Sequence, residues 1–142
     1  MRIEFTIPGE PCGKGRPRFT KSGHTYTPDK TVVYENLVKL EYERRCGDNH
    51  FEADKALGMQ IKAYFQIPKS VSKKKRAEMV NGDIFPTKKP DADNILKIIA
   101  DALNGKAYVD DKQVVTAEVQ KLYAEKGYTE VVIWEVQEND RA

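Results

Sequence analysis

The stretch "LGMQIKAYFQIP", residues 57–68, alternates apolar and polar side chains along its length. Its apolar positions are Leu57, Met59, Ile61, Ala63, Phe65 and Ile67, and its polar face carries Gln60, Lys62, Tyr64 and Gln66. Because successive side chains of a β-strand point to opposite faces, this alternation predicts a strand with one buried face. The fold of this chain is therefore expected to be built on a sheet.

Three further segments are predicted to be strands. Residues 2–9, "RIEFTIPG", alternate in the same way and end at a proline and a glycine. Residues 113–125 and 128–136 are rich in Val, Ile, Tyr and Thr. The short connection around Lys126 and Gly127 predicts that these last two strands form a hairpin.

Three helices are predicted between the strands. In the first, Thr27 is an N-cap, Pro28 is the first helical residue, and the helix ends near Gly47. Its apolar positions at helical spacing are Val33, Tyr34, Leu37 and Leu40. The second is a short basic helix within residues 69–82, capped by Ser70 or Ser72.

The third predicted helix runs from Asp93 to Asn104 and ends at Gly105 as a C-cap glycine. Its apolar face consists of Ile95, Ile98, Ile99, Ala102 and Leu103. The opposite face carries Lys97 and Asp101, four residues apart, which are expected to form an ion pair on the helix surface. The order of elements predicts an α+β (mixed α/β) fold with helices packed on a mixed sheet.

The length of 142 residues predicts one domain, spanning residues 1–142. No apolar run approaches the roughly 20 residues that cross a bilayer, and the first ten residues do not have the pattern of a signal peptide. We therefore expect a cytoplasmic protein without a membrane partner. Cys12 and Cys46 stand far apart, which argues against a zinc site or a disulfide framework.

The positive charges gather in two segments, although the net charge is only +2. Such a distribution suits a polyanion such as nucleic acid. The first segment, "GKGRPRF", is predicted to be an irregular arm, and the second contains the basic helix. The predicted DNA-binding residues are Lys14, Arg16 and Arg18 in the arm, and Lys73, Lys74, Lys75 and Arg76 in the helix.

The negative charges of most interest fall in "KKPDADNILKIIADALNGKAYVDDKQVV", residues 88–115. Its aspartates are Asp91, Asp93, Asp101, Asp110 and Asp111. An aspartate at a helix start is often only a cap, but two at i and i+2 followed by a further pair exceed what capping requires. Carboxylates held together repel unless a cation compensates, and ligands that offer only oxygen suit Mg²⁺ or Mn²⁺.

"KPDADNILKIIADALNG" and "AYVDDKQV" resemble the signature of the RusA family of Holliday junction resolvases. "IPGEPCGKGRPRF" and "YTPDKTVVYE" are similar to the amino-terminal region of that family. The resemblance implies a RusA-like fold and a metal-dependent endodeoxyribonuclease that cuts four-way DNA junctions by paired symmetric nicks, in DNA recombination and repair. It also implies a homodimer, Mg²⁺ or Mn²⁺ as the cofactor, no small-molecule cofactor, and a frequent phage or prophage origin.

Position by position, the resemblance implies that Asp91, Asp93 and Asp111 bind the metal and that Lys97 is catalytic. Asp110 is implied only as an outer or alternative ligand. Two other readings stay open: a nuclease acting on other branched DNA, and a protein that binds junctions or forks without cutting them. The combination of these acids with Lys97 favours the enzyme, because binding alone would prefer fewer negative charges near phosphate.

Overall fold

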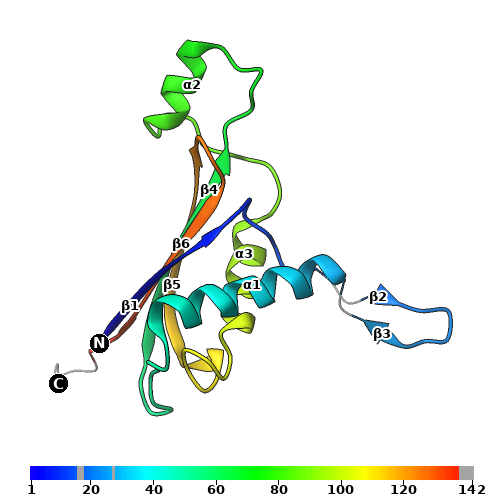
Figure 1. Cartoon of the computed structure of the whole chain (residues 1–142), viewed down its shortest axis with the longest axis vertical. Helices are drawn as coiled ribbons and strands as arrows, with labels where there is room; N and C mark the ends of the chain where they lie inside the picture. The colour runs from blue at the N-terminus through cyan, green and yellow to red at the C-terminus, as the bar shows by residue number, and fades with distance from the viewer. Residues whose placement is uncertain (16–17, 27, 138–142) are drawn as a thin grey trace.

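Strand β4 (Leu57–Gln66) lies inside a four-stranded mixed sheet whose order is β1-β6-β4-β5 (Figure 1). The computed structural model describes residues 1–15, 18–26 and 28–137. β4 pairs antiparallel with β6 (Tyr128–Glu135) and parallel with β5 (Val114–Ala124). β1 (Arg2–Pro8) pairs antiparallel with β6 and forms one edge.

The predicted alternation of β4 is confirmed. Along its inner face Leu57, Met59, Ile61 and Ala63 are 0% exposed and Phe65 is 1% exposed. β1 alternates in the same way, with Ile3, Phe5 and Ile7 buried and their neighbours exposed. The central strand β4 and the edge strand β1 therefore both contribute a fully buried face to the core.

The predicted hairpin between the last two strands is wrong. β5 and β6 both pair with β4 and lie on opposite sides of it, so the short connection around Lys126 and Gly127 passes the end of β4 instead of joining neighbours. Proximity in sequence favoured a hairpin, but burial decided the pairing. β5 is mostly half-buried or exposed, which suits an edge, whereas β4 needs partners on both sides.

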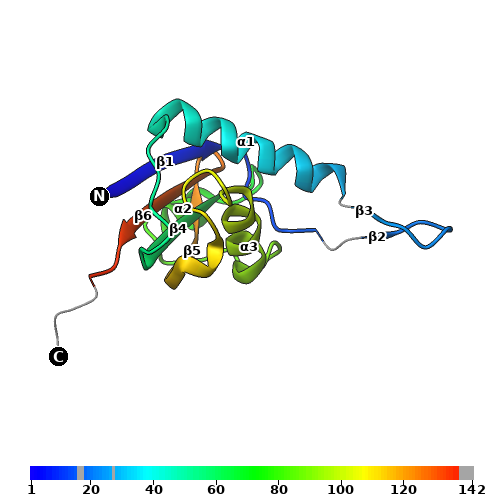
Figure 2. The ribbon, with the colours of Figure 1, turned by 90° about the horizontal axis from the view of Figure 1, so that it is seen from below.

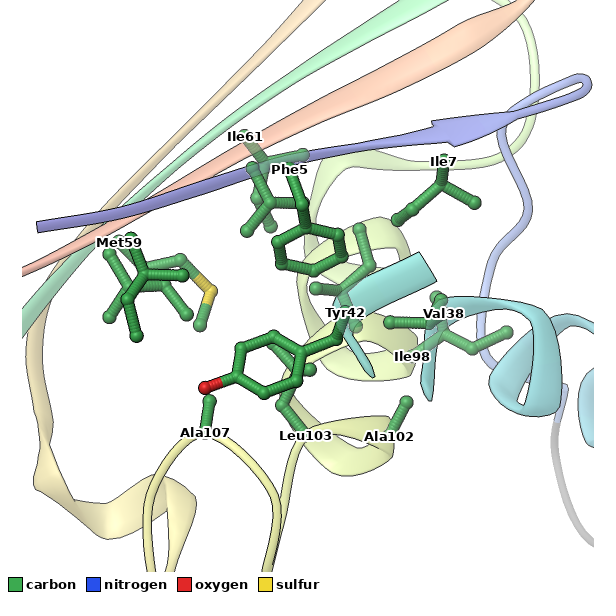
Figure 3. Close-up of a cluster of buried hydrophobic side chains, with 14 of the residues drawn as sticks. Phe5, Ile7, Val38, Tyr42, Met59, Ile61, Ile98, Ala102, Leu103 and Ala107 are labelled. Atoms are coloured by element: carbon green, nitrogen blue, oxygen red, sulfur yellow. The ribbon is translucent and has the colours of Figure 1, made fainter. Parts of the chain in front are cut away.

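Helices α1 (Asp29–Cys46) and α3 (Ala92–Ala102) cover one face of the sheet (Figure 2). Between sheet and helices lies a core in which the rings of Phe5 and Tyr42 form a T-shaped pair, with centroids 5.5 Å apart (Figure 3). The fold is therefore α+β with one core, as predicted. Both cysteines are free thiols, as expected, and both are buried.

The first helix differs from the prediction at its start and on its face. Pro28 is the N-cap, not the first helical residue, and the predicted cap Thr27 lies outside the described residues. The buried face consists of Thr31, Tyr34, Val38, Tyr42 and Cys46. Val33 and Leu40 are exposed, at 67% and 48%. Burying the large rings of Tyr34 and Tyr42 removes more apolar surface from water than burying these two aliphatic side chains would.

The third helix has the predicted apolar face, since Ile95, Ile98, Ile99, Ala102 and Leu103 are all buried. Its bounds differ slightly from the prediction. Asp91 is the N-cap and Leu103 the C-cap, so Gly105, with φ of 76°, lies in the turn beyond the helix. That turn returns the chain towards β5 through a bond from the Gly105 N–H to the Tyr108 carbonyl oxygen, 2.9 Å long.

Two elements extend away from the sheet. Helix α2 (Lys73–Val80) lies at one end, and the two-stranded ribbon of β2 (Arg18–Phe19) and β3 (Thr25–Tyr26) projects from the start of α1 (Figure 1). Of the two predicted caps for α2, Ser72 is confirmed, because its hydroxyl accepts a bond from the Lys75 N–H. Within the described residues, no helix is long and apolar enough to cross a membrane.

Candidate active site

Asp93, Lys97 and Asp111 line one groove of about 380 Å³. The first two project from α3, one helical turn apart, and Asp111 begins the 3-10 turn η1 (Asp111–Gln113). The opposite wall is the start of β5, from Val114 to Ala117. Asp93 and Asp111, 18 positions apart in sequence, line the same groove because the turn after α3 returns the chain to the sheet beside the helix.

Asp91 occupies the N-cap position of α3, yet its side chain accepts no capping hydrogen bond from the described residues. Capping therefore does not explain this aspartate. Asp91 lines a neighbouring groove with Gly13, Lys14 and Asn94. Of the three predicted metal ligands, Asp93 and Asp111 share a groove, and Asp91 lies at the adjacent helix start.

The two members of the Asp110-Asp111 pair have different environments. Asp110 caps η1: its carboxylate accepts the Lys112 N–H at 2.9 Å, and the Gln113 side-chain oxygen accepts the Asp110 N–H at 3.1 Å. The bond from Lys112 lowers the pKa of Asp110. Asp111 is anchored through its backbone, whose N–H donates to Asn104 Oδ1 at 2.7 Å, and its carboxylate lines the groove.

The Asp111 carboxylate is in surroundings that suit a cation. Partial burial raises its pKa, and the neighbouring carboxylates of Asp110 and Asp101 raise it further. In the described part of the chain, no three His, Cys, Asp or Glu side chains already converge as a metal site. Excess negative charge and ligands that offer only oxygen nevertheless fit a hard divalent ion, which completes its shell with water or phosphate oxygens.

Lys14 forms ion pairs with two carboxylates next to the groove, those of Glu35 and Asp101. Its Nζ is 2.7 Å from Glu35 Oε2 and 3.3 Å from Asp101 Oδ2, so the lysine joins α1 to α3. The pairings with Glu35 and Asp101 raise the pKa of Lys14, although burial, the largest single effect, acts to lower it. Asp101 also keeps the predicted pairing with Lys97, but at a longer distance of 3.9 Å.

The glycines on either side of Lys14 explain how it reaches this position. A Cβ on Gly13 would meet Pro90 Cβ at 2.8 Å, and one on Gly15 would meet Thr31 Oγ1 at 2.7 Å. Only glycine lets the backbone pass this closely between the two helices. "GKG", predicted as part of an irregular arm, is therefore a packed connection at this point.

The remaining predicted DNA-binding residues are differently placed. Lys73, Lys74 and Lys75 are exposed on α2, and Arg76 pairs with Glu125 at 2.8 Å. Arg16 lies outside the described residues, and only the backbone of Arg18 is described. A DNA contact by any of these residues, Lys14 included, stays a prediction.

Sequence reasoning missed Glu35, Asn104 and the capping role of Asp110. The pattern D-x-x-Q at residues 110–113 matches a capping box and was sufficient to identify that cap. No local pattern marks Glu35 as a partner of Lys14, since the two are 21 residues apart and belong to different elements.

Comparison with known proteins identifies the family of this chain. The model of a family described as "Endodeoxyribonuclease RusA" matches residues 8–134 and so includes every residue of both grooves. A protein of Bacillus subtilis (strain 168), named "Uncharacterized protein YqaN", is 40% identical over 139 residues. That match covers 94% of this chain and 96% of the relative.

Proposed function

Because this chain belongs to the RusA family of endodeoxyribonucleases, we propose that it resolves four-way DNA junctions by paired symmetric nicks. The observation that carries the proposal is the groove that Asp93, Asp111 and Lys97 line together. Acids and a lysine on one wall are the groups that metal-assisted phosphodiester hydrolysis requires. The proposed setting is DNA recombination and repair in the cytoplasm, in a host or in a phage or prophage.

Asp91, Asp93 and Asp111 are the proposed ligands of Mg²⁺, with Mn²⁺ as a substitute. The chemistry that a bound divalent cation supplies is polarisation of the phosphoryl group and a lowered pKa for water. The protein fixes these acids from two directions: α3 carries the first two, and the capped turn η1 carries the third. Asp110 serves the site indirectly by holding η1 in shape.

Lys97 is the proposed catalytic cation. Its ammonium lies on the same groove wall as Asp93 and is 63% exposed, so a phosphate that enters the groove has access to it. Positive charge aimed at the reacting phosphate stabilises the charge that develops in the transition state. Lys97 thus offsets the repulsion between the acids and the DNA backbone.

The basic residues outside the groove are proposed to hold the DNA. The proposed contacts are to the phosphate backbone and do not depend on base sequence. They are made by Lys73, Lys74 and Lys75 on α2 and by Arg16 and Arg18 in the arm. A homodimer is part of the proposal, because a junction presents two equivalent strands about a two-fold axis. One groove per protomer then serves each strand.

Cleavage of synthetic substrates tests this function. The purified protein is incubated with a four-way junction, a fork and a linear duplex, each with Mg²⁺, Mn²⁺ or EDTA. We expect nicks at symmetric positions of the junction only, and none in EDTA. Equal cutting of linear duplex would refute the resolvase, and preference for the fork would indicate another branched substrate. Binding of the junction without any nicking would identify a binding protein.

Substitution of the acids separates catalysis from binding. Asp91→Asn and Asp111→Asn are expected to abolish nicking and to retain junction binding, because they remove charge from the metal site and leave the basic residues intact. Circular dichroism and thermal melting check that both variants fold. If both unfold, the acids are structural and the proposed metal site is wrong.

A further inference from the structure

One carboxylate oxygen, Asp101 Oδ2, has two ammonium groups near it. Lys14 Nζ is 3.3 Å away and Lys97 Nζ is 3.9 Å away. The two lysines belong to different parts of the chain. Lys14 lies in the amino-terminal segment, and Lys97 lies on α3 one helical turn before Asp101. The pairing with Lys14 weakens the attraction of Asp101 for Lys97, so the two cations compete.

The competition favours Lys14. Its side chain is only 22% exposed and also bonds Glu35 Oε2 at 2.7 Å, so it is held between two carboxylates. Its backbone is fixed as well, since the Lys14 N–H donates to the Asn94 carbonyl oxygen at 3.0 Å. The next N–H, of Gly15, donates to Thr31 Oγ1 at 3.0 Å.

Lys97 is held far less firmly. Its side chain is 63% exposed, and its pairing with Asp101 is an (i, i+4) contact at the long end of the ion-pair range. Exposed pairs of this kind contribute little because water screens them and a long side chain loses entropy when it is fixed. The Lys97 ammonium is therefore available to the groove that it lines with Asp93 and Asp111.

We propose that Lys14 is a positioning residue which neutralises Asp101 and thereby keeps Lys97 free to meet the phosphate in the groove. This inference rests on the proposed function, because it assigns Lys97 its catalytic task. It gives Lys14 a role other than the phosphate contact predicted from the sequence. Without Lys14, Lys97 turns to the unpaired Asp101 and is withdrawn from the substrate.

Lys14→Met tests the proposal, since methionine keeps an unbranched apolar side chain and removes the charge. At saturating junction we expect kcat to fall by about 10- to 100-fold, the range typical of partners that orient a catalytic group. Junction Kd and its salt dependence stay as in the wild type. Lys106→Met is the matched control, because it breaks another ion pair with α1, that of Lys106 with Glu43, and is expected to retain kcat.

Two variants separate positioning from simple structural damage. Lys14→Arg retains a cation between Glu35 and Asp101 and is expected to keep most of the activity. In the double variant Lys14→Met/Asp101→Asn, the carboxylate that captures Lys97 is gone, so kcat is expected to recover towards the wild-type value. If the double variant is no faster than Lys14→Met, the proposal is overturned.

Nuclear magnetic resonance of lysine ammonium groups gives a readout that does not depend on cleavage. In Lys14→Met the Lys97 Nζ signal is expected to shift and to exchange its protons more slowly, as in a tighter ion pair with Asp101. An unchanged Lys97 signal overturns the inference, even if the wild type cuts no junction and the proposed function itself fails. Weaker junction binding with a smaller salt slope in Lys14→Met also overturns it and identifies a phosphate contact.

Discussion

The acidic segment from Asp91 to Gln113 and the basic helix α2 are attached to the molecule in different ways. α3 buries three isoleucines and two alanines, and Gln113 of η1 donates to the Glu52 and Lys55 carbonyl oxygens. α2 buries Met79 and leaves Lys73, Lys74 and Lys75 in solvent. In the proposed function, the catalytic groups need exact placement and lie on a buried scaffold. The proposed DNA-binding charges act over roughly 8 to 10 Å and therefore tolerate a projecting helix.

The largest expected effect lies in the acidic segment. Asp111→Asn is expected to lower kcat by at least about a thousand-fold, which leaves no detectable nicking, because losing a proposed ligand removes several kcal/mol of transition-state stabilisation. The matched control is Asp110→Asn, since asparagine is also a good N-cap. Single-turnover cleavage of a labelled junction measures both. Equal losses in the two variants would show that η1 supports the site as a unit and that the two aspartates have no separate roles.

The scaffold beneath the acids gives the next effect. Ile98→Ala opens a cavity at a side chain that is 0% exposed, and is expected to lower the free energy of unfolding by about 2 to 5 kcal/mol. Urea denaturation followed by circular dichroism measures the change. Val80→Ala, at a position of α2 that is 55% exposed, is the control and should change stability by less than about 0.5 kcal/mol. Comparable losses would mean that α2 is as firmly attached as α3.

The charges of α2 give a smaller and different effect. The triple substitution of Lys73, Lys74 and Lys75 by alanine is expected to weaken junction binding. It should also reduce the slope of log K against log salt by about 0.9 for each phosphate that the protein no longer neutralises. The cleavage rate at saturating junction stays unchanged. Glu78→Gln on the same helix is the control and should not weaken binding. An unchanged slope in the triple variant would remove α2 from the DNA-binding surface.

The smallest effect concerns the cap of α2. Ser72→Ala is expected to destabilise this helix by about 1 kcal/mol, because the Lys75 N–H loses its partner. Hydrogen exchange should therefore accelerate in residues 73–80 and stay the same in α3. Ser70→Ala, the other cap predicted from the sequence, is the control. A fall in the global melting temperature with Ser72→Ala would indicate that α2 unfolds together with the core.

Local patterns predicted what local physics determines. The alternation of β4 and the apolar face of α3 follow from periodicity alone, and both are confirmed. The place of β5 did not follow, because strand pairing depends on how segments far apart in sequence pack together. The face of α1 was only partly predicted: Tyr34 is buried as expected, but Val33 and Leu40 are exposed and Tyr42 is buried instead.

The candidate site also contains residues that local sequence patterns identify and residues that they do not. The resemblance of the aspartate motifs to a known family led to the groove acids, and a capping-box pattern was available for Asp110. The setting of Lys14 was not predictable, since it needs Glu35 from α1, Asp101 from α3, and two glycines that let the chain pass between these helices. Interactions between elements far apart in sequence are known only once the elements are packed.

The close approach of Gly15 to the start of α1 also limits how far the projecting ribbon extends. A Cβ on Gly15 would meet Pro28 Cγ at 3.1 Å, so the chain leaves the core at Gly15 and returns to nearly the same point at Pro28. A loop closed in this way has only about six residues from its base to its tip, a span of roughly 20 Å. Phe19 is 75% exposed and only four residues from Gly15, so the length of the chain keeps it within about 14 Å of that base.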